Sequence, residues 1–190
     1  MLAQIVVGAA ILYPLQVTKS GGEHGNPTLG FHALVDGVLG FIYPSLKRYT
    51  HFPQVDLGMA LSYAIFLALA ATGKDPLAPL FETGTSGLSL SDRVADVVVS
   101  PVAQWALYLY LAGVIWTVIF DTIYAHQDYV DDLKAGVMGL AVLLGRKGTK
   151  PAFYVAIAVQ VYLLVLAGLF AGFGIGYYVV SCGVTGLVLT

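Results

Sequence analysis

Six long apolar segments limit what this 190-residue chain can fold into more than any other feature. Only 11% of its residues are charged, whereas a soluble domain of this length carries about 25%. Segments of this length and composition are typical of membrane helices. We therefore expect an all-α fold, a multi-span transmembrane helical bundle, with its spans at these places: Leu2–Gln16, His32–Leu46, Val55–Thr72, Val102–Phe120, Ala152–Phe170 and Phe173–Leu189.

The charge of the connecting loops predicts how the spans are oriented. If the segments alternate in direction, the loops at 47–54 and 121–150 lie on one side and carry six of the nine basic residues. The positive-inside rule assigns that side to the cytosol or its equivalent. A short surface helix is expected over "LSDRVADVV", with Ser91 or Asp92 near its cap. The formal net charge of −2 gives no reason to expect nucleic acid as a partner.

An acidic stretch, "FDTIYAHQDYVDDLKAG" (120–136), follows the fourth segment. If the fourth helix continues through it, one face within an arc of about 100° carries these residues: Asp121, Tyr124, Ala125, Asp128 and Asp132. Stacked carboxylates at a membrane surface repel one another, and Mg²⁺, which prefers oxygen ligands, would offset the repulsion. A solvated acidic loop is the alternative. On the same helix His126 faces away from the aspartates, and His32 has no partner at metal-ligand spacing.

A basic pair, Lys47 and Arg48, lies between two prolines in "YPSLKRYTHFPQVDLG" (43–58). The pair can form an anion clamp for phosphate or carboxylate, in which arginine offers a planar fork and lysine a point charge. It can equally act as a topology signal or contact lipid headgroups. The residues alone leave both interpretations open.

Together the two stretches resemble motifs of the UbiA family of intramembrane prenyltransferases. "DTIYAHQDYVDDLKAG" is similar to the second aspartate-rich motif, and "YPSLKRYTHFPQVDLG" to a motif of the 4-hydroxybenzoate polyprenyltransferase branch, which includes fungal meroterpenoid enzymes. The resemblance covers about residues 1–190, treated as one domain. It implies an all-helical membrane enzyme that uses Mg²⁺ to transfer a prenyl group from an isoprenoid diphosphate to an aromatic acceptor, such as 4-hydroxybenzoate or a related phenolic acid.

The resemblance also assigns roles to individual residues. Asp128 and Asp132 match the metal-binding D-x-x-x-D, so they are the expected Mg²⁺ ligands. Asp121 and Tyr124 match the D-x-x-Y just upstream and are expected at the catalytic cavity, with Tyr124 also contacting substrate. Lys47 and Arg48 are expected near the diphosphate or the aromatic carboxylate. Lys134, at the end of the acidic stretch, is a further substrate-binding candidate.

Two departures from the family pattern stand out. The first aspartate motif, N-D-x-x-D-x-x-x-D, does not occur in the sequence. We therefore expect about six of the family's usual nine helices, without the first two and the last. In addition, Met138 and Gly139 stand where the family usually has Lys-Ser, which removes a basic group beside the second motif.

These departures keep a second interpretation open. The chain can be a non-catalytic membrane relative that binds isoprenoid or partners a full-length enzyme. A transporter is disfavoured because its acidic residues belong near the middle of the membrane, whereas these follow the end of a segment. A role in ubiquinone or meroterpenoid biosynthesis is expected, in the mitochondrial inner membrane or the endoplasmic reticulum if the source is eukaryotic.

Overall fold

The computed structural model describes residues 27–46, 48–81 and 89–189, which are largely helical and contain no strand. Among these residues, four helices are long and apolar enough to cross a membrane: α2 (Pro27–Leu46), α3 (Pro53–Ala71), α6 (Pro101–Ala125) and α8 (Leu140–Ala171). Shorter helical pieces connect or follow them: α4 (Ala78–Phe81), α5 (Leu90–Val99), α7 (Tyr129–Ala135), α9 (Ile175–Tyr177), the π-helix η1 (Tyr178–Val184) and α10 (Thr185–Leu189). The prediction of an all-α, multi-span membrane fold is confirmed.

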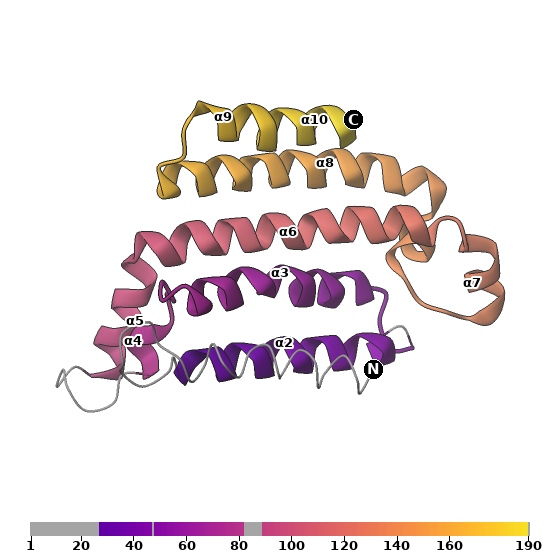
Figure 1. The fold of residues 1–190 in the computed structure, drawn as a ribbon. Helices are drawn as coiled ribbons and strands as arrows, with labels where there is room; N and C mark the ends of the chain where they lie inside the picture. The colour runs from indigo at the N-terminus through magenta and orange to yellow at the C-terminus, as the bar shows by residue number, and fades with distance from the viewer. Residues whose placement is uncertain (1–26, 47, 82–88, 190) are drawn as a thin grey trace.

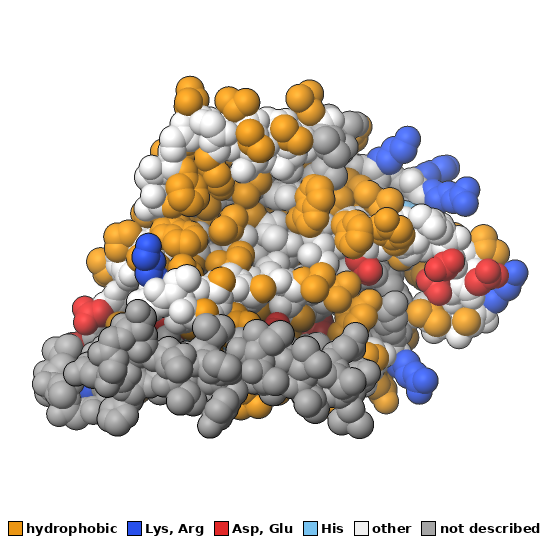
Figure 2. All heavy atoms as spheres, in the orientation of Figure 1, with side chains coloured by type: hydrophobic (Ala, Val, Ile, Leu, Met, Phe, Trp, Pro, Cys, Tyr) orange, Lys and Arg blue, Asp and Glu red, His pale blue; other side chains and the backbone are white. Residues whose placement is uncertain are grey.

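The long helices lie side by side in chain order, each antiparallel to the one before it (Figure 1). α2 packs on α3, α3 on α6 and α6 on α8, and the C-terminal pieces η1 and α10 pack on α8. Buried alanines on α6 and α8, such as Ala112 and Ala167, let the helix backbones approach closely, as is usual between membrane helices. Hydrophobic side chains are spread over α6 and α8 on the face shown in Figure 2, which makes a surface suited to lipid.

Two of the loops assigned to one side by their charge lie at the same end of the bundle. α2 ends and α3 begins there, and α6 ends and α8 begins there as well (Figure 1). Acidic and basic side chains gather at this end in Figure 2. The aspartates and the 47–54 loop therefore share one end of the molecule. The assignment of this end to the cytosol stays a prediction.

Several predicted boundaries are wrong, and the largest error concerns α8. It begins at Leu140, twelve residues before the predicted Ala152, and is kinked at Gly145 (φ 60°, ψ 178°). The basic residues and the proline after the kink had indicated a loop, but long basic side chains can extend from a helix end to the membrane surface. α2 and α6 are also longer than predicted, and the sixth segment begins at Ile175 as one helix whose middle, Tyr178–Val184, is π-helical. The predicted segment Leu2–Gln16 lies outside the described residues.

The predicted surface helix exists as α5, but its cap lies earlier than expected. Ser89 is the N-cap and accepts a hydrogen bond from the Asp92 amide, while the Asp92 carboxylate accepts one from the Ser89 amide. This reciprocal capping box satisfies two backbone donors at the start of the helix. Asp92 therefore takes part in the cap, as predicted, and Ser89 replaces Ser91 as the residue that begins it.

The contact between α3 and α6 depends on Gly58. A Cβ atom at this position would lie 2.8 Å from the Val114 carbonyl oxygen and 3.1 Å from the Val114 Cα. Because the obstacle is backbone, a side chain at Gly58 can be accommodated only if the two helices move apart. Gly58 therefore sets the distance between the helices that carry Gln54 and Asp121.

We expect Gly58→Ala to destabilise the protein by about 1–3 kcal/mol, the usual cost of overpacking a close contact. Gly40→Ala is the matched control, since a Cβ at Gly40 would have no atom of the described residues within 4 Å. The control should be neutral or gain up to about 1 kcal/mol from the better helix propensity of alanine. Unfolding of both variants in SDS would measure the difference, and equal stabilities would show that the helices separate without cost.

Candidate functional site

A cavity of about 210 Å³ lies where α6 ends and α8 begins. The polar side chains that line it come from α3, α6, α7 and the turn before α7: Gln54, Asp121, Tyr124, Gln127, Asp128 and Asp132. Its remaining wall is small or apolar: Ala125, Val137, Met138, Gly139, Ala141 and Val142. Three carboxylates therefore face one small space at the end of an apolar bundle.

The polypeptide places these carboxylates by breaking the helix, not by continuing it. α6 ends at Ala125, and His126 is its C-cap. After the turn, the Asp128 carbonyl oxygen accepts hydrogen bonds from the amides of Asp131 (3.0 Å) and Asp132 (2.9 Å). Asp128 and Asp132 are thereby one turn apart at the start of α7. Gly136, with φ +66°, ends α7 in the left-handed conformation that glycine adopts at little cost.

The supposition that the helix from Val102 continues through the acidic stretch is wrong, although the residues of the supposed face do come together. A continuous helix would place Asp128, Asp131 and Asp132 near its C-terminal end, where the helix dipole repels negative charge. The break moves Asp131 and Asp132 into the first turn of α7, where the dipole attracts them, and Lys134 into the last turn. Asp121, Tyr124, Ala125, Asp128 and Asp132 line the cavity from two helices and a turn.

Gln54 is a cavity residue that was not singled out from the sequence. It is the second residue of α3, is 2% exposed, and its side chain reaches towards the turn before α8. A Cβ atom at Gly139 would lie 3.4 Å from Gln54 Nε2. The Gln54 Oε1 atom is buried without a hydrogen-bond partner. Its place directly after Pro53, in the motif quoted above, was the one available signal.

The chemistry of the cavity fits a hydrated Mg²⁺ ion. Carboxylate and amide oxygens are the hard ligands that Mg²⁺ prefers, and the ion commonly binds through one or two carboxylates while it keeps several waters. Among the described residues no three His, Cys, Asp or Glu side chains form a ready-made metal cage. The buried, unpaired Gln54 Oε1 is one atom that such an ion and its water could satisfy. The predicted ligands Asp128 and Asp132 remain the candidates.

The predicted basic partners are placed differently. Arg48 is exposed in the turn after α2 and does not line the cavity. The Lys134 side chain is 73% exposed, and its Nζ lies 3.5 Å from Asp131 Oδ1. Asp131 does not line the cavity. Lys47 lies outside the described residues. Contact of these three side chains with substrate stays a prediction.

His126 connects α6 to α8 and does not line the cavity. Thr149 Oγ1 donates to the Gly145 carbonyl oxygen (2.7 Å), so it accepts from His126 Nε2 (2.8 Å). The His126 contact therefore lies beside the kink of α8.

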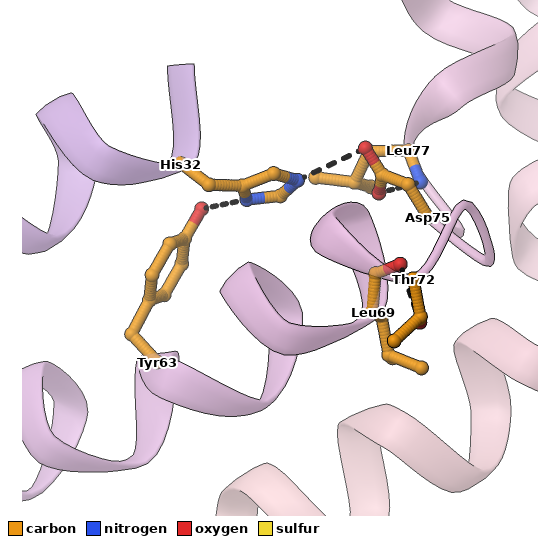
Figure 3. Close-up of polar contacts among 6 residues, drawn as sticks. All are labelled: His32, Tyr63, Leu69, Thr72, Asp75 and Leu77. Carbon is orange, nitrogen blue, oxygen red and sulfur yellow. Dashed lines mark hydrogen bonds and ion pairs between the residues drawn. The ribbon is translucent and has the colours of Figure 1, made fainter. Parts of the chain in front are cut away.

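A second polar cluster lies at the opposite end of the bundle and joins α2, α3 and the loop after α3 (Figure 3). His32 is fully buried; its Nε2 lies 3.1 Å from Asp75 Oδ2 and its Nδ1 lies 2.9 Å from the Tyr63 hydroxyl. Because a carboxylate can only accept, Nε2 carries a proton and donates to Asp75. Asp75 Oδ1 also accepts from the Leu77 amide at 2.8 Å.

The environment of Asp75 favours its ionised form. Burial by itself would raise the pKa of Asp75, but hydrogen bonds from His32, Thr28 and the Leu77 amide hold that pKa below its ordinary value of 3.8. Because His32 and Asp75 are far apart in the sequence, no sequence pattern indicated that their side chains would form a hydrogen bond. The pair closes the α2–α3 contact, so we interpret it as structural.

The fold and the cavity define a class of protein: a multi-span helical membrane protein with a carboxylate-lined cavity at one end of the helix bundle. The chain belongs to the UbiA prenyltransferase family, whose sequence profile matches residues 2–190. The resemblance inferred from the two motifs is therefore confirmed.

Relatives of the chain are bacterial proteins named 4-hydroxybenzoate octaprenyltransferase. The protein from Alkalilimnicola ehrlichii is 40% identical over 80% of this chain and 43% of its own length. The protein from Citrobacter koseri is 36% identical over 74% of this chain and 39% of its own length. The protein from Vibrio parahaemolyticus is 38% identical over 74% of this chain and 40% of its own length. The chain thus spans less than half the length of these curated relatives. No solved structure matches it.

Proposed function

We propose that this chain forms part of an Mg²⁺-dependent prenyltransferase that joins a prenyl group from an isoprenoid diphosphate to an aromatic acceptor. The observation that carries the proposal is the convergence of Asp121, Asp128 and Asp132 on one cavity at the end of an apolar bundle. A membrane-embedded diphosphate lipid needs both features, since its head requires a cation and its tail requires an apolar channel or surface.

The proposed reaction is an electrophilic substitution on the aromatic ring. The bond between the allylic carbon and the diphosphate oxygen breaks, and the electron pair leaves with the diphosphate. A ring carbon attacks the allylic cation, a carbon–carbon bond forms, and the ring loses a proton. A bound Mg²⁺ supplies positive charge that stabilises the departing diphosphate.

The residues of this chain contribute binding and positioning. Asp128 and Asp132 would hold the metal ion, and Asp121 adds negative charge from the end of α6. The Tyr124 hydroxyl at the cavity wall can donate a hydrogen bond to a substrate oxygen. The apolar helices exclude water, which would otherwise quench the cation.

The acceptor class rests on the relatives. Their names favour 4-hydroxybenzoate or a related phenolic acid. A role in ubiquinone or meroterpenoid biosynthesis stays a prediction, and placement in a eukaryotic organelle has no support because the relatives named above are bacterial. The domain extent and the missing helices likewise stay predictions.

The test is prenyl transfer by membranes that contain the chain. The membranes receive Mg²⁺, radiolabelled allylic diphosphates of several lengths and a panel of phenolic acids, and empty-vector membranes serve as the control. We expect a lipid-soluble product that requires both the diphosphate and the phenolic acid. Mg²⁺-dependent retention of labelled diphosphate without any product would favour the non-catalytic relative, and absence of both would contradict the proposal.

A further inference from the structure

Gln54 is a buried residue at the cavity wall whose amide oxygen has no hydrogen-bond partner in the part of the chain that the structure describes. Its Oε1 atom is buried and unpaired, although the residue is only 2% exposed. A buried polar group without a partner costs about 1–3 kcal/mol. Gln54 is the second residue of α3, directly after Pro53, and its Nε2 faces Gly139, where an added Cβ atom would lie 3.4 Å away. The amide oxygen thus lies at the cavity and is available to a ligand.

The charge of the cavity decides which ligand this amide suits. Asp121, Asp128 and Asp132 line the same space, so the local potential attracts cations and repels anions. The unpaired Gln54 atom is an oxygen, which can only accept a hydrogen bond or coordinate a cation. The acidic lining and the unpaired oxygen therefore favour the same ligand, a cation that is bound together with its water molecules.

We propose that Gln54 is a further binding residue of this cavity, whose amide oxygen contacts the water shell of a divalent cation held by Asp128 and Asp132. The inference rests on the proposed function, because it takes the metal ion from there. Gln54 positions the cation through its water and joins the end of α3 to a site otherwise built by α6 and α7. A hydrogen-bonding partner of this kind typically changes metal affinity 10–100-fold when it is lost.

Mn²⁺ alone is the probe. The electron paramagnetic resonance signal of free Mn²⁺ is lost when the ion binds, so the titration measures affinity without any catalysis. The purified full chain in detergent is titrated as wild type, Gln54→Leu and Gln54→Glu. We expect Gln54→Leu to bind Mn²⁺ at least about 10-fold more weakly. Gln54→Glu keeps an oxygen at the same position, so it should bind at least as tightly as the wild type.

Gln160→Leu is the matched control. Gln160 on α8 is also buried, at 4% exposure, and its Oε1 is also unpaired, but it does not line the cavity. Its replacement should leave Mn²⁺ affinity within about twofold of the wild type, well below the loss expected of a metal contact. The control separates the loss of a cavity contact from the general effect of removing a buried amide.

Each outcome decides the matter. Wild-type binding with an unchanged Gln54→Leu affinity would overturn this inference and leave the proposed function standing. No Mn²⁺ binding by the wild type would overturn both. If Gln54→Leu fails to fold, the Gln54→Glu variant decides alone, since weakened binding there would contradict a role for the oxygen at this position.

Discussion

Replacing Asp128 with asparagine is expected to lower prenyl transfer by about 10²–10³-fold, the usual loss when one electrostatic contact to a developing charge is removed. Asparagine has the same size but lacks the charge that would hold Mg²⁺. Asp128 is the N-cap of α7, and asparagine is a good N-cap, so the fold should be retained. Initial rates would be measured across Mg²⁺ concentrations, and the concentration for half-maximal rate should rise. Mn²⁺ binding provides a readout that does not need turnover.

Asp131→Asn is the control for this prediction. Asp131 lies three residues after Asp128, is 86% exposed and pairs with Lys134. It does not line the cavity. Its replacement should change the rate less than about twofold, since an exposed pair of this kind contributes little. Equal losses in both variants would mean that the total negative charge of the stretch matters and that the cavity has no special role.

Removing His32 is expected to destabilise the protein by about 1–3 kcal/mol, the cost of leaving a buried polar group without its hydrogen-bond partner. His32→Leu would leave the Asp75 carboxylate buried beside apolar atoms, with the side chains of both residues at most 1% exposed in the native fold. The double variant His32→Leu/Asp75→Leu should be less destabilised than the sum of the single variants. SDS unfolding of the full cycle would measure the coupling.

Lys74→Ala is the matched control, because Lys74 precedes Asp75 and is exposed. Its stability should stay within about 0.5 kcal/mol of the wild type. If the losses of unfolding free energy in the two single variants add up to the loss in the double variant, His32 and Asp75 are not coupled. The 3.1 Å contact would then contribute nothing measurable to stability.

The same pair determines how stability changes in acid. The pKa of Asp75 is lower in the folded protein than its ordinary value of 3.8. The stabilisation from the ionised carboxylate is therefore complete above that value and is lost as the pH falls through the lower pKa of the fold. Asp75→Asn should flatten this acid dependence while it keeps the hydrogen bond from Leu77.

The class of fold could be predicted from the sequence because it depends on local composition. A run such as Val102–Phe120 has too few polar side chains to lie in water, so it indicates a membrane helix whatever surrounds it. The two motifs identified the family for a similar reason, since each is a continuous stretch. Helical spacing led us to expect Asp121, Asp128 and Asp132 together, but they meet for a different reason, because the helix breaks and two helices and a turn present them.

The sequence by itself therefore determined that the protein is helical, spans a membrane and brings its acidic stretch to one end. Only the tertiary structure decided that Gln54 enters the acidic cavity from α3 and that His32 meets Asp75 across the opposite end. Both contacts join residues from different helices, and no local pattern records which helices pack together. Helix-to-helix packing, set by close approaches such as Gly58 against Val114, decides those partners.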